Sequence, residues 1–235
     1  LALNGYAQTL QALSGGGATG GAVGLGSATL TIHQNGSSTF AGPISGTGGI
    51  IKTGSGTLTL SGINTYTGVT DIRTGTLAVS GNLSDNSAVQ ITGGATYQVA
   101  HSDLVGSIAG AGTLTSLTGG PVTLTVGNNN TSTLFSGLIS DTPAAPLTLA
   151  KIGTGTLTLT HSNTYTGGTR VGGGILQDVA RLDGDRPLRV LGERDRVGVG
   201  AEASFERAGD GDGGSGSSGS FTRVRKPRAE ITLRP

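Results

Sequence analysis

The chain has 235 residues, of which 45 are Gly, with no Cys, Met or Trp and only 3% aromatic residues. The absence of Cys excludes disulfides and thiolate metal sites, and a net charge of +1 gives no global attraction to nucleic acid or an anionic membrane. No run of about 20 apolar residues is present, so we expect no direct membrane insertion. The chain begins at Leu1 without a leader-like segment, from which we expect a fragment or a processed form.

Residues 1–177 are predicted to form short β segments separated by turns rich in Gly, Asn and Ser. Helix is nearly excluded, because Gly, Thr, Ser and Asn are mediocre or poor helix formers and no apolar stripe recurs at helical spacing. Residue types alternate strictly within Thr57–Leu60, which places Leu58 and Leu60 on one face and the two Thr on the other. A second TLTL segment later in the chain repeats this alternation. These patterns predict an all-β fold with Leu, Ile and Val facing inward.

One long sequence occurs twice, beginning at Lys52 and again at Lys151, 99 residues later. Both copies carry a Lys, a GxG pair, a TLTL run, an NTYTG run and a final Leu. Internal repetition is typical of folds that stack one unit, because a single short unit cannot bury its apolar face alone. The repeat positions expected to build this stack are Lys52, Gly54, Gly56, Leu58, Leu60, Asn64, Tyr66, Gly68, Lys151, Gly153, Gly155, Leu157, Leu159, Asn163, Tyr165 and Gly167.

The two copies resemble the passenger-associated repeat of Gram-negative autotransporters, whose pattern is GxLxKxGxGTLTLxGxNTYTGxTxVxxGTLxV. Residues 48–81 match this pattern almost throughout, and residues 149–176 match it with His161 in place of Gly62. Residues 83–114 also resemble the material between such repeats. The resemblance implies a right-handed parallel β-helix, a solenoid that is exported and then displayed or released at the cell surface.

A parallel β-helix stacks like residues above like, with rungs about 4.8 Å apart. At roughly 20 to 25 residues per rung, residues 1–177 are expected to form roughly seven to nine rungs. The two long repeats span about residues 30–81 and 124–177. Charge marks the end of this passenger segment: residues 1–177 hold four basic and four acidic residues, whereas the remaining 58 residues hold 11 and 10.

Two residue pairs within the repeat have expected local roles. Asn64 and Asn163 precede a Tyr in a turn, where Asn tolerates a left-handed backbone and can form a ladder with Asn in neighbouring rungs. Tyr66 and Tyr165 are interpreted as packing or stacking residues, with sugar binding as the less favoured role.

The second copy stops after Gln177, where the first copy continues with Ala78-Val79-Ser80-Gly81. Residues 178–235 instead form a charged, Gly-rich tail without a period, as a shifted reading frame of a GC-rich gene tends to produce. We predict that the tail is irregular or disordered, and we hypothesise a frameshift near codon 177. A natural disordered linker is the alternative, since residues 211–220 form a flexible low-complexity run. Sequencing the locus tests the frameshift: an intact frame that continues into a barrel-coding region would support it, and recurrence of the same tail in relatives would contradict it.

The remaining motifs predict no catalytic, cofactor or metal site. The GxGxxG pattern at Gly15 lacks a following helix whose N-terminus could hold a phosphate. His101, Ser102 and Asp103 are adjacent in sequence, so their side chains point in different directions on an extended backbone rather than into a triad. A calcium-binding β-roll motif at residues 208–212 occurs once, although such motifs act through repetition.

We therefore expect a non-enzymatic segment of an autotransporter passenger, secreted from or displayed on a Gram-negative bacterium. It is interpreted as a surface stalk or adhesin-like scaffold whose repeats assist folding and export. The resemblance implies an outer-membrane β-barrel translocator as partner, and nothing after residue 177 supplies the amphipathic strands of such a barrel. One alternative is a module that binds glycans or a host surface through outward Thr rows. Another is a fragment of a β-helical polysaccharide-degrading enzyme.

Overall fold

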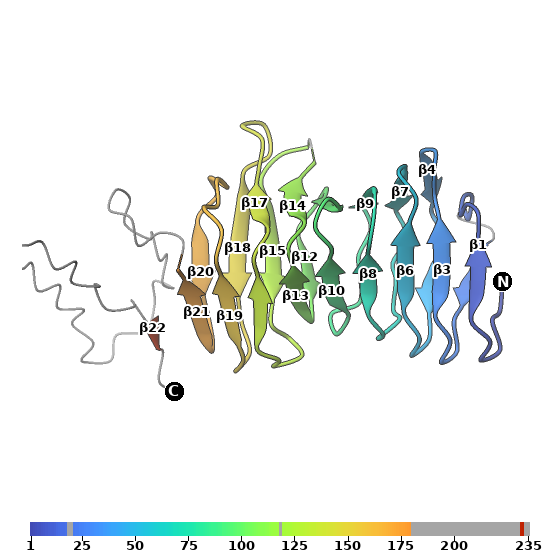
Figure 1. The fold of residues 1–235 in the computed structure, drawn as a ribbon, viewed down its shortest axis with the longest axis horizontal. Helices are drawn as coiled ribbons and strands as arrows, with labels where there is room; N and C mark the ends of the chain where they lie inside the picture. The colour runs from blue at the N-terminus through green and yellow to red at the C-terminus, as the bar shows by residue number, and fades with distance from the viewer. Residues whose placement is uncertain (18–20, 118, 180–230, 233–235) are drawn as a thin grey trace, which may run out of the picture.

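The fold is an elongated β-solenoid, seen in a computed structural model that describes residues 1–17, 21–117, 119–179 and 231–232. Within these residues every regular element is a β strand. Parallel strands stack into about 8 turns along one axis (Figure 1). The described residues contain no helix that could cross a membrane. The predicted all-β, parallel β-helix is confirmed, as is the predicted number of rungs.

Four parallel sheets run along the solenoid. The largest has the order β1 (Gln8–Leu10), β3 (Leu30–His33), β6 (Ile50–Thr53), β8 (Thr70–Ile72), β10 (Ala88–Ile91), β13 (Ser107–Gly110), β16 (Thr133–Phe135), β19 (Thr156–Leu159), β21 (Ile175–Asp178) and β22 (Ile231–Thr232). The second has the order β17 (Leu138–Ser140), β14 (Thr113–Ser116), β11 (Thr96–Val99), β9 (Thr76–Val79), β7 (Thr57–Leu60) and β4 (Ser38–Phe40). The smaller sheets are β12 (Asp103–Val105), β15 (Val122–Val126), β18 (Leu147–Lys151) and β20 (Thr169–Val171), and the pair β2 (Val23–Gly24) and β5 (Ile44–Ser45). Only the β21–β22 pairing among these strands is antiparallel.

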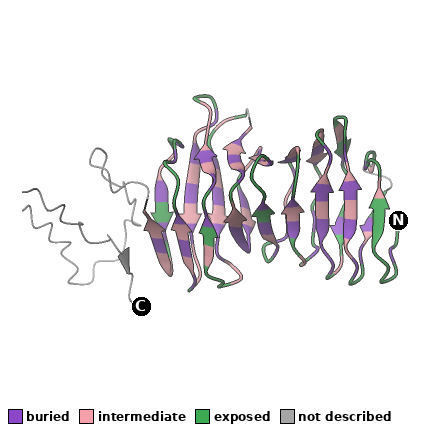
Figure 2. Cartoon of the chain, viewed as in Figure 1, coloured by how far each residue is buried: buried purple, intermediate pink, exposed green. Residues whose placement is uncertain are grey.

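The core is a continuous column of aliphatic side chains inside the solenoid. In β7, Leu58 and Leu60 are fully buried whereas the alternating Thr57 and Thr59 lie at intermediate exposure, as the purple and pink bands of Figure 2 show for many strands. Leu58 stacks on Leu77 of the next turn through a parallel register. Each fully buried Leu contributes about 1.5–3 kcal/mol, so a stack of short strands gains stability that one strand alone lacks.

The two sequence copies lie on different sides of the solenoid. Lys52 belongs to the ten-stranded sheet, where successive turns place Ile72, Ile91, Gly110, Phe135 and Leu159 above it. Lys151 belongs instead to the four-stranded sheet. Likewise the first TLTL segment, β7, lies in the six-stranded sheet and the second, β19, in the ten-stranded sheet. The chain therefore makes more than four turns, but not five, between the copies.

The third side of the solenoid changes its character along the axis. It begins with β2 and β5, and the backbone N–H of Ile44 donates a hydrogen bond to the side-chain oxygen of Asn64 in the next turn. Asn64 bonds to Asn82 of the following turn, and Asn82 bonds to Asp103, where the four-stranded sheet starts. On this side of the solenoid, the turns of the first copy are therefore joined by side-chain hydrogen bonds, whereas turns further along the chain are joined by paired β strands.

The predicted division at residue 177 falls near the end of the continuously described residues. The described solenoid extends to residue 179, and β22 adds a short antiparallel pairing to β21. Most of the tail, residues 178–235, lies outside the described residues, and so does the 208–212 motif.

Candidate functional site

The repeat lysines are buried inside the solenoid and bind backbone carbonyls. The Lys52 Nζ atom donates to the carbonyl oxygens of Thr53 at 2.9 Å, Gly54 at 2.9 Å and Thr74 at 3.1 Å, and the side chain is 0% exposed. We call this set the Lys52 carbonyl cluster. Because Thr74 lies one turn beyond Lys52, the ammonium group links two successive turns.

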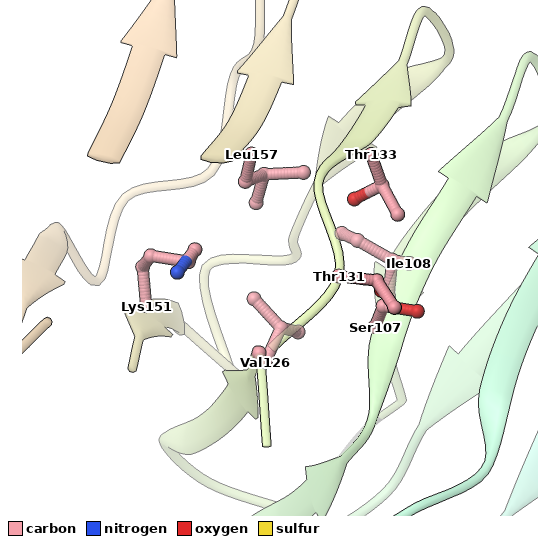
Figure 3. Close-up of a pocket in the computed structure, with 8 residues that line it drawn as sticks. Ser107, Ile108, Val126, Thr131, Thr133, Lys151 and Leu157 are labelled. Atoms are coloured by element: carbon pink, nitrogen blue, oxygen red, sulfur yellow. The ribbon is translucent and has the colours of Figure 1, made fainter. Parts of the chain in front are cut away.

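The second copy builds an equivalent Lys151 carbonyl cluster on another side of the solenoid. Its Nζ atom donates to the carbonyl oxygens of Ile152, Gly153 and Gly173, the last lying one turn further on. Figure 3 shows Lys151 beside Val126 and Leu157, around a gap too narrow to hold a water molecule. Burial lowers the pKa of both lysines, and the three carbonyl dipoles at each ammonium group replace the hydration that burial removes.

The six glycines of the repeat share one structural reason. A Cβ atom added at any of them would lie 2.0–2.5 Å from a backbone atom of the preceding turn, which is closer than atoms can approach. Gly54 and Gly153 also have positive φ angles of 79° and 68°, which side chains rarely adopt. The full set is Gly54, Gly56, Gly68, Gly153, Gly155 and Gly167. These glycines occur where successive turns touch backbone to backbone.

The repeat asparagines hold the turns together through their side-chain amides. The Asn64 Oδ1 atom accepts from Ile44 N–H at 3.1 Å, and its Nδ2 atom donates to Gly62 O at 3.1 Å and Asn82 O at 2.9 Å. Asn64 thereby bridges the turns before and after its own. The expected left-handed backbone and Asn ladder are wrong, because neither Asn64 nor Asn163 has a positive φ and the Asn64 side-chain partners are backbone groups.

Asn163 repeats half of this arrangement. Its Oδ1 atom accepts from Ile139 N–H at 2.8 Å, as Asn64 accepts from Ile44. Its Nδ2 atom is buried and makes no hydrogen bond within the described part of the chain. The position equivalent to Asn82 falls at residue 181, which lies outside the described residues.

The repeat tyrosines point into the core. The Tyr66 hydroxyl lies 2.6 Å from the Thr70 hydroxyl, which lies 2.9 Å from the Ser87 hydroxyl of the next turn. Ser87 donates to the Gly68 carbonyl at 2.8 Å. Tyr165 pairs with Thr169 at 2.5 Å in the same way. Burial raises the pKa of Tyr66 well above its ordinary value, and no solvent-facing surface remains for a sugar to stack on.

The repeat leucines are simple core residues. Leu58, Leu60, Leu157 and Leu159 are all at most 2% exposed. With the lysines, glycines, asparagines and tyrosines described above, all sixteen expected repeat positions therefore lie on the inner wall of the solenoid or at contacts between its turns. The structure brings them together as two separate sets rather than as one surface.

One buried polar centre was missed at the sequence level. The Asp103 carboxylate is 6% exposed and accepts from Leu83 N–H, Leu104 N–H and the Asn82 amide at 3.0–3.1 Å. Desolvation raises the pKa of Asp103, and these hydrogen bonds oppose the rise. The Tyr97 hydroxyl is buried without a hydrogen bond within the described residues. No sequence signal marks either residue, since both depend on stacking.

Catalytic arrangements do not form around the described histidines. His101 Nδ1 contacts the Ser102 carbonyl rather than the Asp103 carboxylate, and Asp103 faces the solenoid interior. His33 pairs with the Thr53 hydroxyl at 3.2 Å, and His161 with the Ser162 carbonyl. In the ranges that the structure covers, no three His, Cys, Asp or Glu residues are grouped as metal ligands.

Comparisons with known proteins agree with this structure. The family described as "Passenger-associated-transport-repeat" matches residues 50–79 and 149–177, which are the two copies. The chain is 38% identical over 62% of its length to the adhesin BmaC autotransporter of Brucella suis, and it covers 4% of that protein. It is 44% identical over 23% of its length to an extracellular serine protease of Serratia marcescens, covering 5% of that protein. It is 46% identical over 27% of its length to the autotransporter lipoprotein NalP of Neisseria meningitidis, covering 6%. No solved structure matches.

The two copies thus match the passenger-associated transport repeat, and the resemblance to an autotransporter passenger domain is confirmed. The chain spans a small fraction of each relative, between 4% and 6% of their lengths. A secreted or cell-surface location on a Gram-negative bacterium follows from this likeness. The repeat region resembles a passenger scaffold rather than a catalytic domain.

Proposed function

We propose that this chain is a non-enzymatic structural segment of an autotransporter passenger, in which the repeats fasten consecutive turns of the solenoid. One observation carries the proposal: three buried polar side chains of the first copy, Lys52, Asn64 and Thr70, each bond across a turn boundary. Lys52 binds the carbonyl of Thr74, and Asn64 binds that of Asn82. Through Thr70, the Tyr66 hydroxyl reaches Ser87.

Fastening of this kind suits a chain that folds turn by turn after export. A solenoid is stabilised by nearest-neighbour contacts, so a turn that binds its neighbours through directional bonds provides a template for the next. In this proposal residues 1–177 form the scaffold, residues 178–235 are dispensable for it, and a β-barrel translocator in the outer membrane is the export partner. The adhesin among the relatives supports a surface role, and the described histidines, none of which faces a hydroxyl and a carboxylate together, support a role without catalysis.

Hydrogen exchange of the full chain tests this proposal. We expect the slowest-exchanging amides in residues 44–82, around the first copy, and faster exchange in residues 96–126, which lack the repeat. Lys52→Met should accelerate exchange in residues 50–79, whereas Arg73→Met, which removes a half-exposed side chain that pairs with Asp71, should not. Equal protection in both regions, or equal effects of the two substitutions, would contradict the proposal.

A further inference from the structure

The outer face of the ten-stranded sheet carries a surface depression, of about 600 Å³, over β10, β13 and β16. The depression is shallow and open, so a ligand would lie across the sheet rather than be enclosed. Its lining residues are uncharged: Gln90, Thr92, Gly93, Ala109, Gly110, Ala111, Ser132, Thr133, Leu134 and Ser136. We call it the β13 groove.

The groove exists because its floor is made of small residues. Strand β13 lies between β10 and β16. It ends with Ala109 and Gly110, and Ala111 follows it. Ala109 pairs with Gln90 on one side, while Leu134 rises from β16 on the other. Ser136 donates to the Gly110 carbonyl at 3.3 Å, which fixes one wall to the floor.

Unused polar groups face this groove. The side chains of Gln90 and Thr92 make no hydrogen bond to any described residue, so an amide and a hydroxyl group are free to bind a ligand. Asp71, which lies in register with Gln90 on the neighbouring strand, forms an ion pair with Arg73 at 2.8 Å. The groove therefore offers donors and acceptors without net charge.

Leu134 adds an apolar contact to these polar groups. Its side chain is 53% exposed, and it is the one large hydrophobic side chain on a described strand that is exposed to this extent. An exposed Leu beside alanines and hydroxyl groups complements a ligand with one apolar C–H face and a hydroxylated rim. Neutral sugar rings have this chemistry.

An extended peptide fits the groove less well. Peptides that bind sheets usually add a strand at a free edge through backbone hydrogen bonds. The backbone of β13 is already paired with β10 and β16 on its two sides, so no such edge is available. Recognition must therefore come from side chains projecting out of the sheet.

We propose that the β13 groove binds a neutral oligosaccharide, with Gln90 and Thr92 as hydrogen-bonding residues and Leu134 as the apolar contact. This gives the scaffold a ligand-binding face at one position along its axis. It is independent of the buried repeat side chains, so the fastening role and the binding role can fail separately.

Saturation-transfer NMR and calorimetry with the full chain test the proposal, using cellohexaose, maltohexaose and chitohexaose at millimolar concentration. A heparin hexasaccharide and an uncharged Gly–Thr peptide serve as competing ligand classes. We expect binding of at least one neutral hexasaccharide, loss of that binding in Ala109→Trp, which fills the groove, and weaker binding in Leu134→Ser.

Ala150→Trp is the matched control, because Ala150 is an outward-facing alanine at similar exposure on β18, in a different sheet. Circular dichroism and the urea midpoint of both variants verify that each remains folded. No binding of any neutral hexasaccharide, binding of heparin or the peptide alone, or equal binding by the Ala109→Trp and Ala150→Trp variants would overturn the proposal.

Discussion

The ammonium group of Lys52 donates a hydrogen bond to the carbonyl oxygen of Thr74, 22 residues further along the chain and one turn further along the solenoid. The same group caps the carbonyls of Thr53 and Gly54 within its own turn. The charged side chain thus links two backbone segments through hydrogen bonds instead of forming an ion pair with a carboxylate.

Replacing Lys52 with Met should destabilise the protein. Met preserves most of the buried stem but leaves three carbonyl groups without their donor, at an expected cost of about 2–3 kcal/mol. Urea unfolding followed by circular dichroism measures the change. Arg73→Met is the control, because its ion pair with Asp71 is solvent-exposed and its loss should cost less than about 1 kcal/mol. Equal unfolding midpoints for the two variants would contradict the assigned role of Lys52.

The same substitution at the two repeat asparagines should have unequal effects. Asn64→Asp removes two amide donor contacts, to Gly62 and Asn82, and places a carboxylate beside their carbonyls. Asn163→Asp removes an amide that has no partner within the described residues. We therefore expect the loss in free energy of unfolding to be larger for Asn64→Asp by about 1–3 kcal/mol at neutral pH. A larger loss for Asn163→Asp would show that its amide has a partner outside the described residues.

Removing a tyrosine hydroxyl should have opposite consequences at two core positions. Tyr66→Phe breaks the contact with Thr70 and should cost about 1 kcal/mol. Tyr97→Phe removes a buried hydroxyl that has no partner in the described ranges, so stability should stay unchanged or increase. Thermal unfolding of both variants provides the measurement. The interpretation of Tyr97 fails if its Phe variant is the less stable of the two.

Stability should fall with rising pH because of Asp103. Desolvation raises the pKa of Asp103 in the folded protein above its ordinary value of 3.8, so the folded state retains a proton that the unfolded state has released. This stabilising contribution is fully present below the ordinary value and is lost as pH rises through the folded pKa. Asp103→Asn should remove this dependence. The test is the free energy of unfolding of both proteins in a pH series from about 3 to 7, and parallel curves would refute the prediction.

Much of the fold follows from sequence pattern. The alternation in Thr57–Leu60 correctly predicts a strand with Leu inward, because successive side chains of an extended strand point to opposite faces. The contacts of Lys52 and Asn64 could not be predicted, since both depend on which backbone group the next turn places opposite them. That placement is decided by the length of each turn.

Turn length also explains the position of the second copy. Above Lys52, successive stacked residues lie 20, 19 and 19 residues apart, up to Gly110, and then 25 and 24 residues apart, up to Leu159. The longer turns include the DTPAAP segment, residues 141–146. The added length places the second copy on a different side of the solenoid from the first, and no local sequence motif indicates this shift. The outward Thr rows of the two TLTL segments consequently lie on different sheets and do not form one array.

The offset of the two copies has a mechanical meaning. Fastenings on a single side would leave a rod that opens like a hinge when it is bent away from that side. With Lys52 in the ten-stranded sheet and Lys151 in the four-stranded sheet, the two carbonyl clusters instead reinforce the contacts between turns on two different sides of the solenoid.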